Sequence, residues 1–568
     1  MTPPLNRRTR PRFTWPTTAP RTAFTLLAFA LAVLAFLAFA WLGTAPSAAD
    51  AAVLVSEVPG AHFRANDAAQ IEINRVRSRI RLENLPGAID AAEAAVLKDS
   101  LSGEAWDLLG TLELRRENHR AAHDAFRRAA VLAPDQAAIW NRLAQVSILH
   151  LGYEEEALQA LAYAHAADSL YATAWYTMSL YRWTRAELDA AEEAILRARA
   201  IETDETRSVL WYSAWIGLSL ARGRYSEAAS ALAVHLYSAP GDLAARQHYA
   251  HALRGLGRLD EAKAQLGLLL KSANKQPVWL VESGLVLRAE GKRDSARMTF
   301  ERAVKADSGS FDAGYNLAFE RAALGDTVGA WKELRRLRVI DATNFLVPLY
   351  ASRLARAAGD STRAALAFEE ARRLHPALGL ATAAEAGASA PIPAWSSPDL
   401  AEGERLMERG EFTLASDRFT MAAEDPVRRA AALYWLARSS RMTGASRGLP
   451  VIAAQAGAEA SRGDPVLLRT LAEAQWDARD PARAVPNLRT VRRLAPTDLV
   501  AAAVLSEVLL ETGDGAGARG VWNEVAQEPT RSWRVESSRA AAFAAANDAG
   551  AAIARQRAAA VDYLAPAP

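Results

Sequence analysis

Residues 257–266 read GRLDEAKAQL, and the same pattern returns as GKRDSARMTF at 291–300, GDTVGAWKEL at 325–334 and GDSTRAALAF at 359–368. Each stretch begins 34 residues after the previous one. Each has glycine first, alanine five residues later, and leucine or phenylalanine four residues after that. A fixed period of this length predicts structural units that stack into one elongated body.

Residues 103–136 give one full unit, GEAWDLLGTLELRRENHRAAHDAFRRAAVLAPDQ. Numbering this unit from 1 to 34 gives Trp106, Leu109, Gly110, Ala122, Phe126, Ala129 and Pro134 at positions 4, 7, 8, 20, 24, 27 and 32. This unit resembles the tetratricopeptide repeat, a helix–turn–helix of 34 residues. The small residues at 8 and 20 predict close helix approach, and the proline ends the second helix. Glu113 departs from the family pattern, because position 11 is usually apolar, and it leaves the end of the first helix open.

The repeat frame predicts an all-α, right-handed α-solenoid. We expect a first array of nine units over residues 69–378, a linker or hinge over 379–395, and a second array of five units over 396–566. The unit that starts near 430 is degenerate around Gly448 to Pro450, and the last unit is polar, as a cap requires.

The composition excludes several functional classes. The chain has 568 residues and a formal net charge of +2, whereas nucleic-acid binding needs clustered positive charge. It has no cysteine, which excludes disulfides, cysteine-ligated metals and thiol nucleophiles. Its 51% hydrophobic and 8% aromatic content favours helices, because alanine supplies much of the apolar share.

The N-terminus differs from the rest of the chain. Residues 1–22 carry five arginines and no acid, and residues 23–43, AFTLLAFALAVLAFLAFAWLG, carry no charge. A helix of this length spans one bilayer core, and the arginines favour a cytoplasmic N-terminus. The pattern predicts a signal-anchor at 23–43, a linker at 44–68, and a bacterial inner-membrane protein whose repeats face the periplasm or cell exterior. The alternative is a secreted protein after signal cleavage near residue 49.

The sequence offers no convincing catalytic motif. Gly515, Gly517 and Gly520 spell G-x-G-x-x-G, but they fall inside a helical repeat without the strand that a dinucleotide site needs. His119 and His123 lie four residues apart, and we interpret them as a solvated helix face because a zinc site needs more ligands. We therefore predict no enzyme activity, no cofactor, no metal and no small-molecule substrate.

The resemblance directs attention to the concave groove, which first-helix positions 2, 5, 9, 12 and 13 line in this family. Aromatic and apolar residues come first along that surface and arginines follow. The predicted partner-binding residues are Tyr176, Trp183, Tyr212, Ile216, Arg254, Arg288, Tyr315, Phe319 and Arg356. Such residue types are common among interface hot spots.

Two functions remain open at this stage. The resemblance implies a membrane-tethered scaffold that binds protein or peptide segments in its groove, in envelope assembly, secretion or polysaccharide export. The alternative is a catalytic or non-catalytic subunit of an envelope enzyme complex with a site in the groove. Bound metal or cofactor in the purified protein would favour the second.

Overall fold

The computed structural model describes residues 60–202, 208–272, 276–375, 397–444, 446–525 and 529–565. These ranges are helical, and extended pairing within them is limited to an isolated bridge between His62 and Ser102. None of the described helices has both the length and the apolar character that crossing a membrane requires. The predicted anchor at 23–43 and the predicted linker at 379–395 lie outside the described residues.

The helices before the undescribed segment 376–396 form the first array. It consists of α3 (Asp67–Arg81), α4 (Leu85–Lys98), α5 (Gly103–Arg115), α6 (His119–Leu132), α7 (Ala137–Val146), the π-helix η1 (Ser147–Leu151), α8 (Glu154–Ala167), α9 (Ala172–Thr184), α10 (Leu188–Ile201), α11 (Ser208–Ala221), α12 (Tyr225–Ser238), α13 (Leu243–Gly255), α14 (Leu259–Lys271), α15 (Pro277–Ala289), α16 (Arg293–Ala306), α17 (Phe311–Ala323), α18 (Thr327–Ile340), α19 (Leu346–Ala357) and α20 (Ser361–Leu374).

The helices after that segment form the second array. It consists of α22 (Pro398–Glu408), α23 (Phe412–Ala422), α24 (Arg429–Thr443), α25 (Gly448–Ala460), α26 (Pro465–Asp477), α27 (Pro481–Leu494), α28 (Leu499–Glu511), α29 (Gly515–Val521), α30 (Trp533–Ala545) and α31 (Ala551–Ala560). Consecutive helices pack as antiparallel pairs, α3 with α4 through to α30 with α31, and within each array each pair contacts the next. The described chain is an all-helical solenoid.

The recurrent glycine has a conformational role. Gly257, Gly291, Gly325 and Gly359 have φ values of 73°, 78°, 86° and 77°, in the left-handed region that glycine adopts at little cost. The equivalent turn in other units keeps this conformation without glycine, with positive φ at Glu83, Glu117, Ala186, Arg479 and Asn547. The left-handed turn is therefore a property of the repeat, and glycine is its least strained residue.

The small residues allow the two helices of a unit to approach closely. Ala262, Ala296 and Ala330 have no exposed surface. A Cβ on Gly284 would lie 2.5 Å from the Phe300 ring, so the aromatic residue of the second helix fills the space that a side chain there would take. Glu113, the departure at position 11, lies inside α5 and is buried against Arg116. The first helix therefore continues past the point that the sequence left open.

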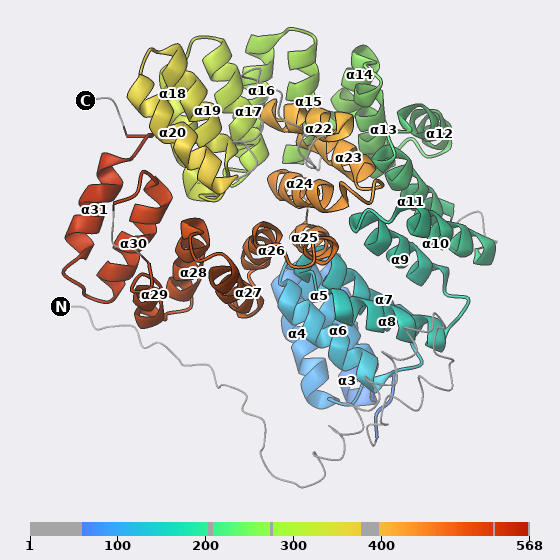
Figure 1. The fold of residues 1–568 in the computed structure, drawn as a ribbon. Helices are drawn as coiled ribbons and strands as arrows, with labels where there is room; N and C mark the ends of the chain where they lie inside the picture. The colour runs from blue at the N-terminus through green and yellow to red at the C-terminus, as the bar shows by residue number, and fades with distance from the viewer. Residues whose placement is uncertain are drawn as a thin grey trace, which may run out of the picture.

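The two arrays share one core. Its largest apolar cluster joins Tyr315 and Leu349 of the first array to Phe412, Phe419 and Trp435 of the second. Figure 1 shows the first array as an arc, blue through green to yellow, with α22–α25 inside it in orange. Contacts of α23 with α11, α24 with α17, and α25 with η1 and α9 agree with this placement.

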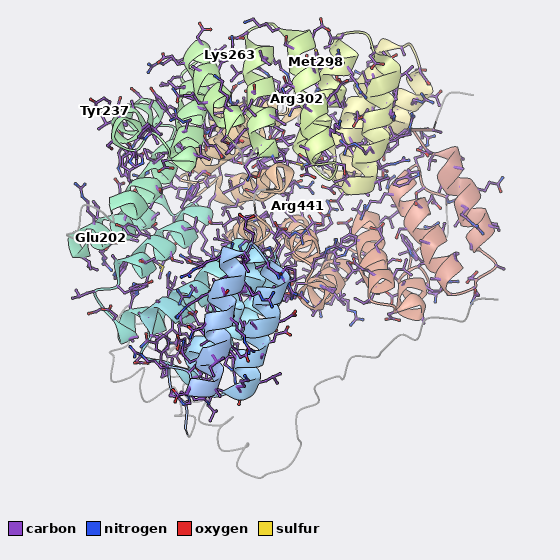
Figure 2. The ribbon with its side chains drawn as sticks, turned by 180° about the vertical axis from the view of Figure 1, so that it is seen from behind. Glu202, Tyr237, Lys263, Met298, Arg302 and Arg441 are labelled. Atoms are coloured by element: carbon purple, nitrogen blue, oxygen red, sulfur yellow. The ribbon has the colours of Figure 1, made fainter. Side chains whose placement is uncertain are left out.

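The view from behind places one charged residue between the arrays. Figure 2 shows Arg441 near the middle of the molecule, whereas Tyr237 and Met298 lie on its outer side. Arg441 of α24 is 3.5 Å from Asp341 of the first array and 3.4 Å from Glu473 of the second. Tyr237, by contrast, is 92% exposed. Charged contacts such as those of Arg441 therefore join the two arrays. They are more directional than apolar contacts, so they help to fix the position of one array against the other.

Candidate protein-binding site

The concave groove of the first array holds the turn between α22 and α23. The last carbonyls of a helix lack intrahelical donors and carry partial negative charge. Three successive carbonyls at the end of α22 find donors in the groove instead: Tyr315 Oη donates to Glu408 at 2.9 Å, Arg288 Nη1 to Arg409 at 2.6 Å, and Asn316 Nδ2 to Gly410 at 3.0 Å. The groove therefore recognises a helix end through its main chain.

Carboxylates on the same segment meet cations in the groove. Arg254 Nη1 lies 3.0 Å from Glu411 of the segment, and Arg254 Nε lies 2.8 Å from Glu282 of the groove. The Arg254 side chain is 3% exposed, and although desolvation lowers its pKa, the two carboxylates raise the pKa overall. Nearer the surface, Arg353 pairs with Glu408 at 2.7 Å. The α22–α23 segment is thus held by charge as well as by its carbonyls.

A buried carboxyl group lies directly beneath this turn. Burial, reinforced by the charge of Glu282, raises the pKa of Asp312 to about 8. Asn316 donates to Asp312 Oδ1 at 2.7 Å as well as to the turn, and it has no exposed surface. With Asp312 protonated at neutral pH, the groove avoids one uncompensated buried charge.

The predicted arginine and tyrosine positions divide into two groups. Arg254, Arg288 and Tyr315 lie together against the α22–α23 segment. Phe319 is half-buried beside them, with its ring centroid 4.7 Å from the Arg288 guanidinium. Arg356 is exposed and does not join this cluster. Their role in binding a second protein stays a prediction.

The predicted aromatic half of the groove is mostly packed within the first array. Tyr176 and Ile216 are 7% and 1% exposed and belong to apolar clusters of neighbouring units. Tyr212 is half-buried and stacks on His235, with 4.8 Å between ring centroids. Trp183 alone of this group lines a cavity that faces the second array. We therefore place the surface that recognises helix ends around Arg254, Arg288 and Tyr315.

The second array makes the reciprocal contact. Its first-helix residues Arg438 and Arg469 donate to the carbonyl of Leu374, the last residue of α20, at 3.5 and 3.2 Å. Tyr434 shares a hydrogen bond of 2.8 Å with the ring of His375, the next residue. Desolvation and the two arginines keep the pKa of His375 well below its usual value. Each array therefore holds a helix end of the other in its concave surface.

Sequence reasoning missed this reciprocity, although its signals are present. Tyr434, Arg438 and Arg469 occupy groove positions 5, 9 and 5 of their units, in the same frame that selected Arg254. The degenerate stretch at Gly448 is a second signal. A Cβ there would lie 2.0 Å from the Ile148 carbonyl of η1, so only glycine fits where α25 meets the first array.

The contact between η1 and the second array is also made through carbonyls. Ser446 Oγ donates to the carbonyl of Leu149, and both terminal nitrogens of Arg483 donate to the carbonyl of Gly152 at 3.0 Å. A π-helix leaves carbonyls misaligned with the helical ladder and available to side chains. The second array uses these carbonyls as anchors.

The two histidines interpreted as a solvated face are partly or fully buried. His123 is 4% exposed and lies 2.9 Å from Glu156. Burial lowers its pKa, but hydrogen bonds with Asp124 and Glu156 raise it to about 9. His119 stacks on His150 of η1 with 3.8 Å between ring centroids. They act as packing and pairing residues, and the solvated-face interpretation is wrong for His123.

The stacked pair of His119 and His150 predicts that acid lowers the stability of the η1 region. Desolvation, with His119 and Arg447, lowers the pKa of His150 to about 4. Between pH 6.5 and 4 the unfolded chain binds a proton that the folded chain excludes, so stability falls as pH drops through this window and levels off below it. We expect the wild type to lose about 1–2 kcal/mol more than His150→Phe between pH 7 and 5. Thermal unfolding of both proteins at the two pH values measures this, and identical pH dependence would refute it.

A protein-family model matches part of this chain. The family model described as the tetratricopeptide repeat matches residues 219–281. A segment of 83 residues is 36% identical to the PEX5-related protein of Homo sapiens, covering 15% of this chain and 13% of that protein. The similarity is therefore confined to a small part of each chain.

Solved structures of repeat proteins are also similar. A tetratricopeptide repeat protein from Parabacteroides merdae is 18% identical, with a TM-score of 0.36, over 42% of this chain and 93% of its own. A thermophilic protein of the same type from Thermus thermophilus is 25% identical, with a TM-score of 0.29, over 33% and 99%. Yeast Tom70 is 15% identical, with a TM-score of 0.26, over 78% and 96%. The family model thus identifies a tetratricopeptide repeat within residues 219–281, and the paired helices before and after that segment are packed in the same helix–turn–helix order.

Proposed function

We propose that this chain is a membrane-tethered scaffold that binds acidic helical segments of partner proteins in the groove of its first array. The observation that carries the proposal is the α22–α23 turn, whose three terminal carbonyls accept hydrogen bonds from Tyr315, Arg288 and Asn316. Main-chain recognition of a helix end does not depend on one sequence. The groove can therefore accept a partner helix in place of its own.

The charges of the groove define the partner's chemistry. The internal segment brings Glu408, Glu411 and Asp417 to Arg353, Arg254 and His251. A competing segment needs carboxylates at similar places, because uncompensated buried arginine would cost several kcal/mol. In the resting chain the α22–α23 segment occupies the groove, and its covalent attachment gives it a high effective concentration. Partner binding thus requires its displacement.

Crosslinking tests this competition. The chain has no cysteine, so Arg353→Cys with Glu408→Cys confines a short bis-maleimide to the groove. The probe is a labelled peptide of residues 397–425. We expect the crosslinked chain to bind it at least tenfold more weakly than the unreacted double variant, measured by fluorescence anisotropy. A matched pair at Arg258 and Glu261, at the start of α14, should leave binding unchanged. Equal binding by locked and unreacted chains would place the site elsewhere.

The membrane tether belongs to the same proposal. Its support is the charge-free run 23–43 after five arginines. We expect a C-terminal reporter that is active only outside the cytoplasm to be active, and the mature protein to keep its N-terminus. An inactive reporter would refute the topology. A mature chain starting near residue 50 would refute the anchor and leave a secreted protein.

A further inference from the structure

The cavity that Trp183 lines lies where the two arrays meet. It has a volume of about 190 Å³ and is enclosed by Trp183 and Thr184 of α9 and by residues of α23, α24 and the start of α25. The described residues that line it include seven serines and threonines, and Asp417 is the single charged residue among them. Lysine, arginine and histidine are absent from that lining. The lining is therefore mainly apolar in exposed surface, with hydroxyl groups and one carboxylate set into it.

Three threonine hydroxyl groups that line the cavity donate their protons to main-chain carbonyls of their own helices. Thr184 donates to the Leu180 carbonyl at 2.8 Å, Thr420 to Ser416 at 2.8 Å and Thr443 to Ser440 at 2.9 Å. A hydroxyl has one proton and two lone pairs, so these oxygens are left as acceptors. A ligand that enters must bring donors of its own.

Asp417 keeps one oxygen for such a ligand. Its Oδ2 accepts from Tyr225 Oη at 3.0 Å and from His251 Nε2 at 2.9 Å. Its Oδ1 accepts no hydrogen bond from the described residues, although its side chain is only 11% exposed. His251 Nδ1 is buried without a hydrogen-bond partner among the described residues.

Trp183 supplies the apolar part of the site. It is half-buried and lines the same cavity as Leu436, Leu449 and Ala453. An indole face attracts cations most strongly among aromatic side chains. A dry cavity of about 150 Å³ binds benzene, so this one accommodates a ligand of similar size. The carboxylate, the acceptor hydroxyl groups and the indole ring all favour a ligand that has a positively charged hydrogen-bond donor and a short apolar part.

We propose that this cavity binds the ammonium group of a small organic amine. The ammonium N–H groups meet Asp417 Oδ1 and the threonine oxygens, and the carbon chain lies against Trp183 and the leucines. An anion is repelled by Asp417, and a neutral alcohol forfeits the charge interaction. The site forms only when α23–α25 lie against α9, so it lies apart from the groove at Arg254 but exists only while α23 stays in its resting position.

Isothermal titration calorimetry of the full chain with n-butylammonium tests the site, with 1-butanol as the neutral isostere at constant ionic strength. We expect the alcohol to bind at least tenfold more weakly. Asp417→Asn, which keeps the shape, and Ser440→Met, which fills the cavity and keeps the charge, should each weaken ammonium binding at least tenfold. Asp399→Asn, an exposed carboxylate paired with Arg418, is the matched control and should bind as the wild type does.

A second ligand tests where the amine comes from. N-acetyl-lysine methylamide carries the same ammonium on a peptide backbone, and its affinity relative to butylammonium tells whether a free amine or a protein lysine is the source. Undetectable ammonium binding, equal affinity for the alcohol, or unchanged binding by Ser440→Met would each overturn the proposal. The Ser440 variant keeps the test valid if Asp417→Asn disturbs the contact with His251.

Discussion

Replacing Gly410 by alanine is expected to release the α22–α23 segment from the groove. Gly410 has φ of +75°, and an added Cβ would lie 2.5 Å from Asn316 Oδ1. Asn316 cannot retreat easily, because it is fully buried and donates both to Asp312 and to Gly410 itself. The substitution thus adds backbone strain and a clash at the same point.

A matched glycine separates these two costs. Gly325 has φ of +86° in the same type of turn, but a Cβ there meets nothing within 4 Å. Both alanine variants pay about 1–2 kcal/mol for the left-handed conformation. Only Gly410→Ala adds about 1–3 kcal/mol of overpacking. The difference between the variants therefore reports the groove contact alone.

Hydrogen exchange followed by mass spectrometry measures the effect directly. Amides of α22 and α23 in Gly410→Ala should exchange at least tenfold faster than in the wild type, because local opening follows local stability. In Gly325→Ala the change should stay within α17 and α18. The same Gly410 variant should bind the 397–425 peptide more tightly than the wild type. Similar loss of protection at α22–α23 in both variants would mean that the turn is not held by the groove.

The repeated helical pairs could be predicted because their determinants are local. Glycine at the turn, alanine at the close approach and a large apolar residue four positions later all act within one 34-residue unit. The burial of Ala296 and Phe300 and the left-handed turn at Gly291 follow from that local pattern. The prediction needed no knowledge of where distant units lie.

The placement of the second array could not be predicted in the same way. It depends on contacts such as Asn316 with Gly410, which are 94 residues apart, and Arg185 with Glu459, which are 274 apart. Repeat periodicity gives no register for such pairs, since it describes only neighbouring units. Consequently the frame identified Arg254 and Arg288 as groove residues but could not indicate that this chain's own helices contact them.

The aromatic residues show how far the position within a repeat unit predicts what a side chain contacts. Tyr176 and Tyr315 both occupy position 5, but Tyr176 packs among α9–α11 and Tyr315 reaches the carbonyl of Glu408. Position alone fixes the face of the helix. The ring can pack against its own array, as Tyr176 does, or contact a segment bound in the groove, as Tyr315 does. Which of the two occurs depends on the size of the adjacent side chains in the assembled array.

Arg254→Met is expected to have the largest effect of any single substitution in the groove. The methionine fills similar space, but Glu282 and Glu411 lose their shared cation. Removing one partner from a buried ion pair costs about 3–5 kcal/mol, because the remaining charge stays desolvated. The loss of stability should appear as release of α22–α23 at a lower urea concentration than in the wild type.

The control lies one turn along the chain. Arg258 pairs with Glu261 at 2.7 Å, but the two side chains are 48% and 51% exposed. Arg258→Met should therefore leave stability essentially unchanged, because the pair is exposed to solvent. Comparable effects of the two substitutions would show that Arg254 contributes no more than a surface charge.

A rescue experiment distinguishes lost charge compensation from lost packing. Adding Glu282→Gln and Glu411→Gln to Arg254→Met removes the orphaned carboxylates while keeping their shape. The triple variant should regain about half or more of the 3–5 kcal/mol, because an uncharged group of similar shape avoids the desolvation cost. The double glutamine variant without Arg254→Met should instead be destabilised, since the arginine then stays buried alone. If the triple variant is no more stable than Arg254→Met, the arginine acts through packing, and the groove would select partners by shape and not by acidic charge.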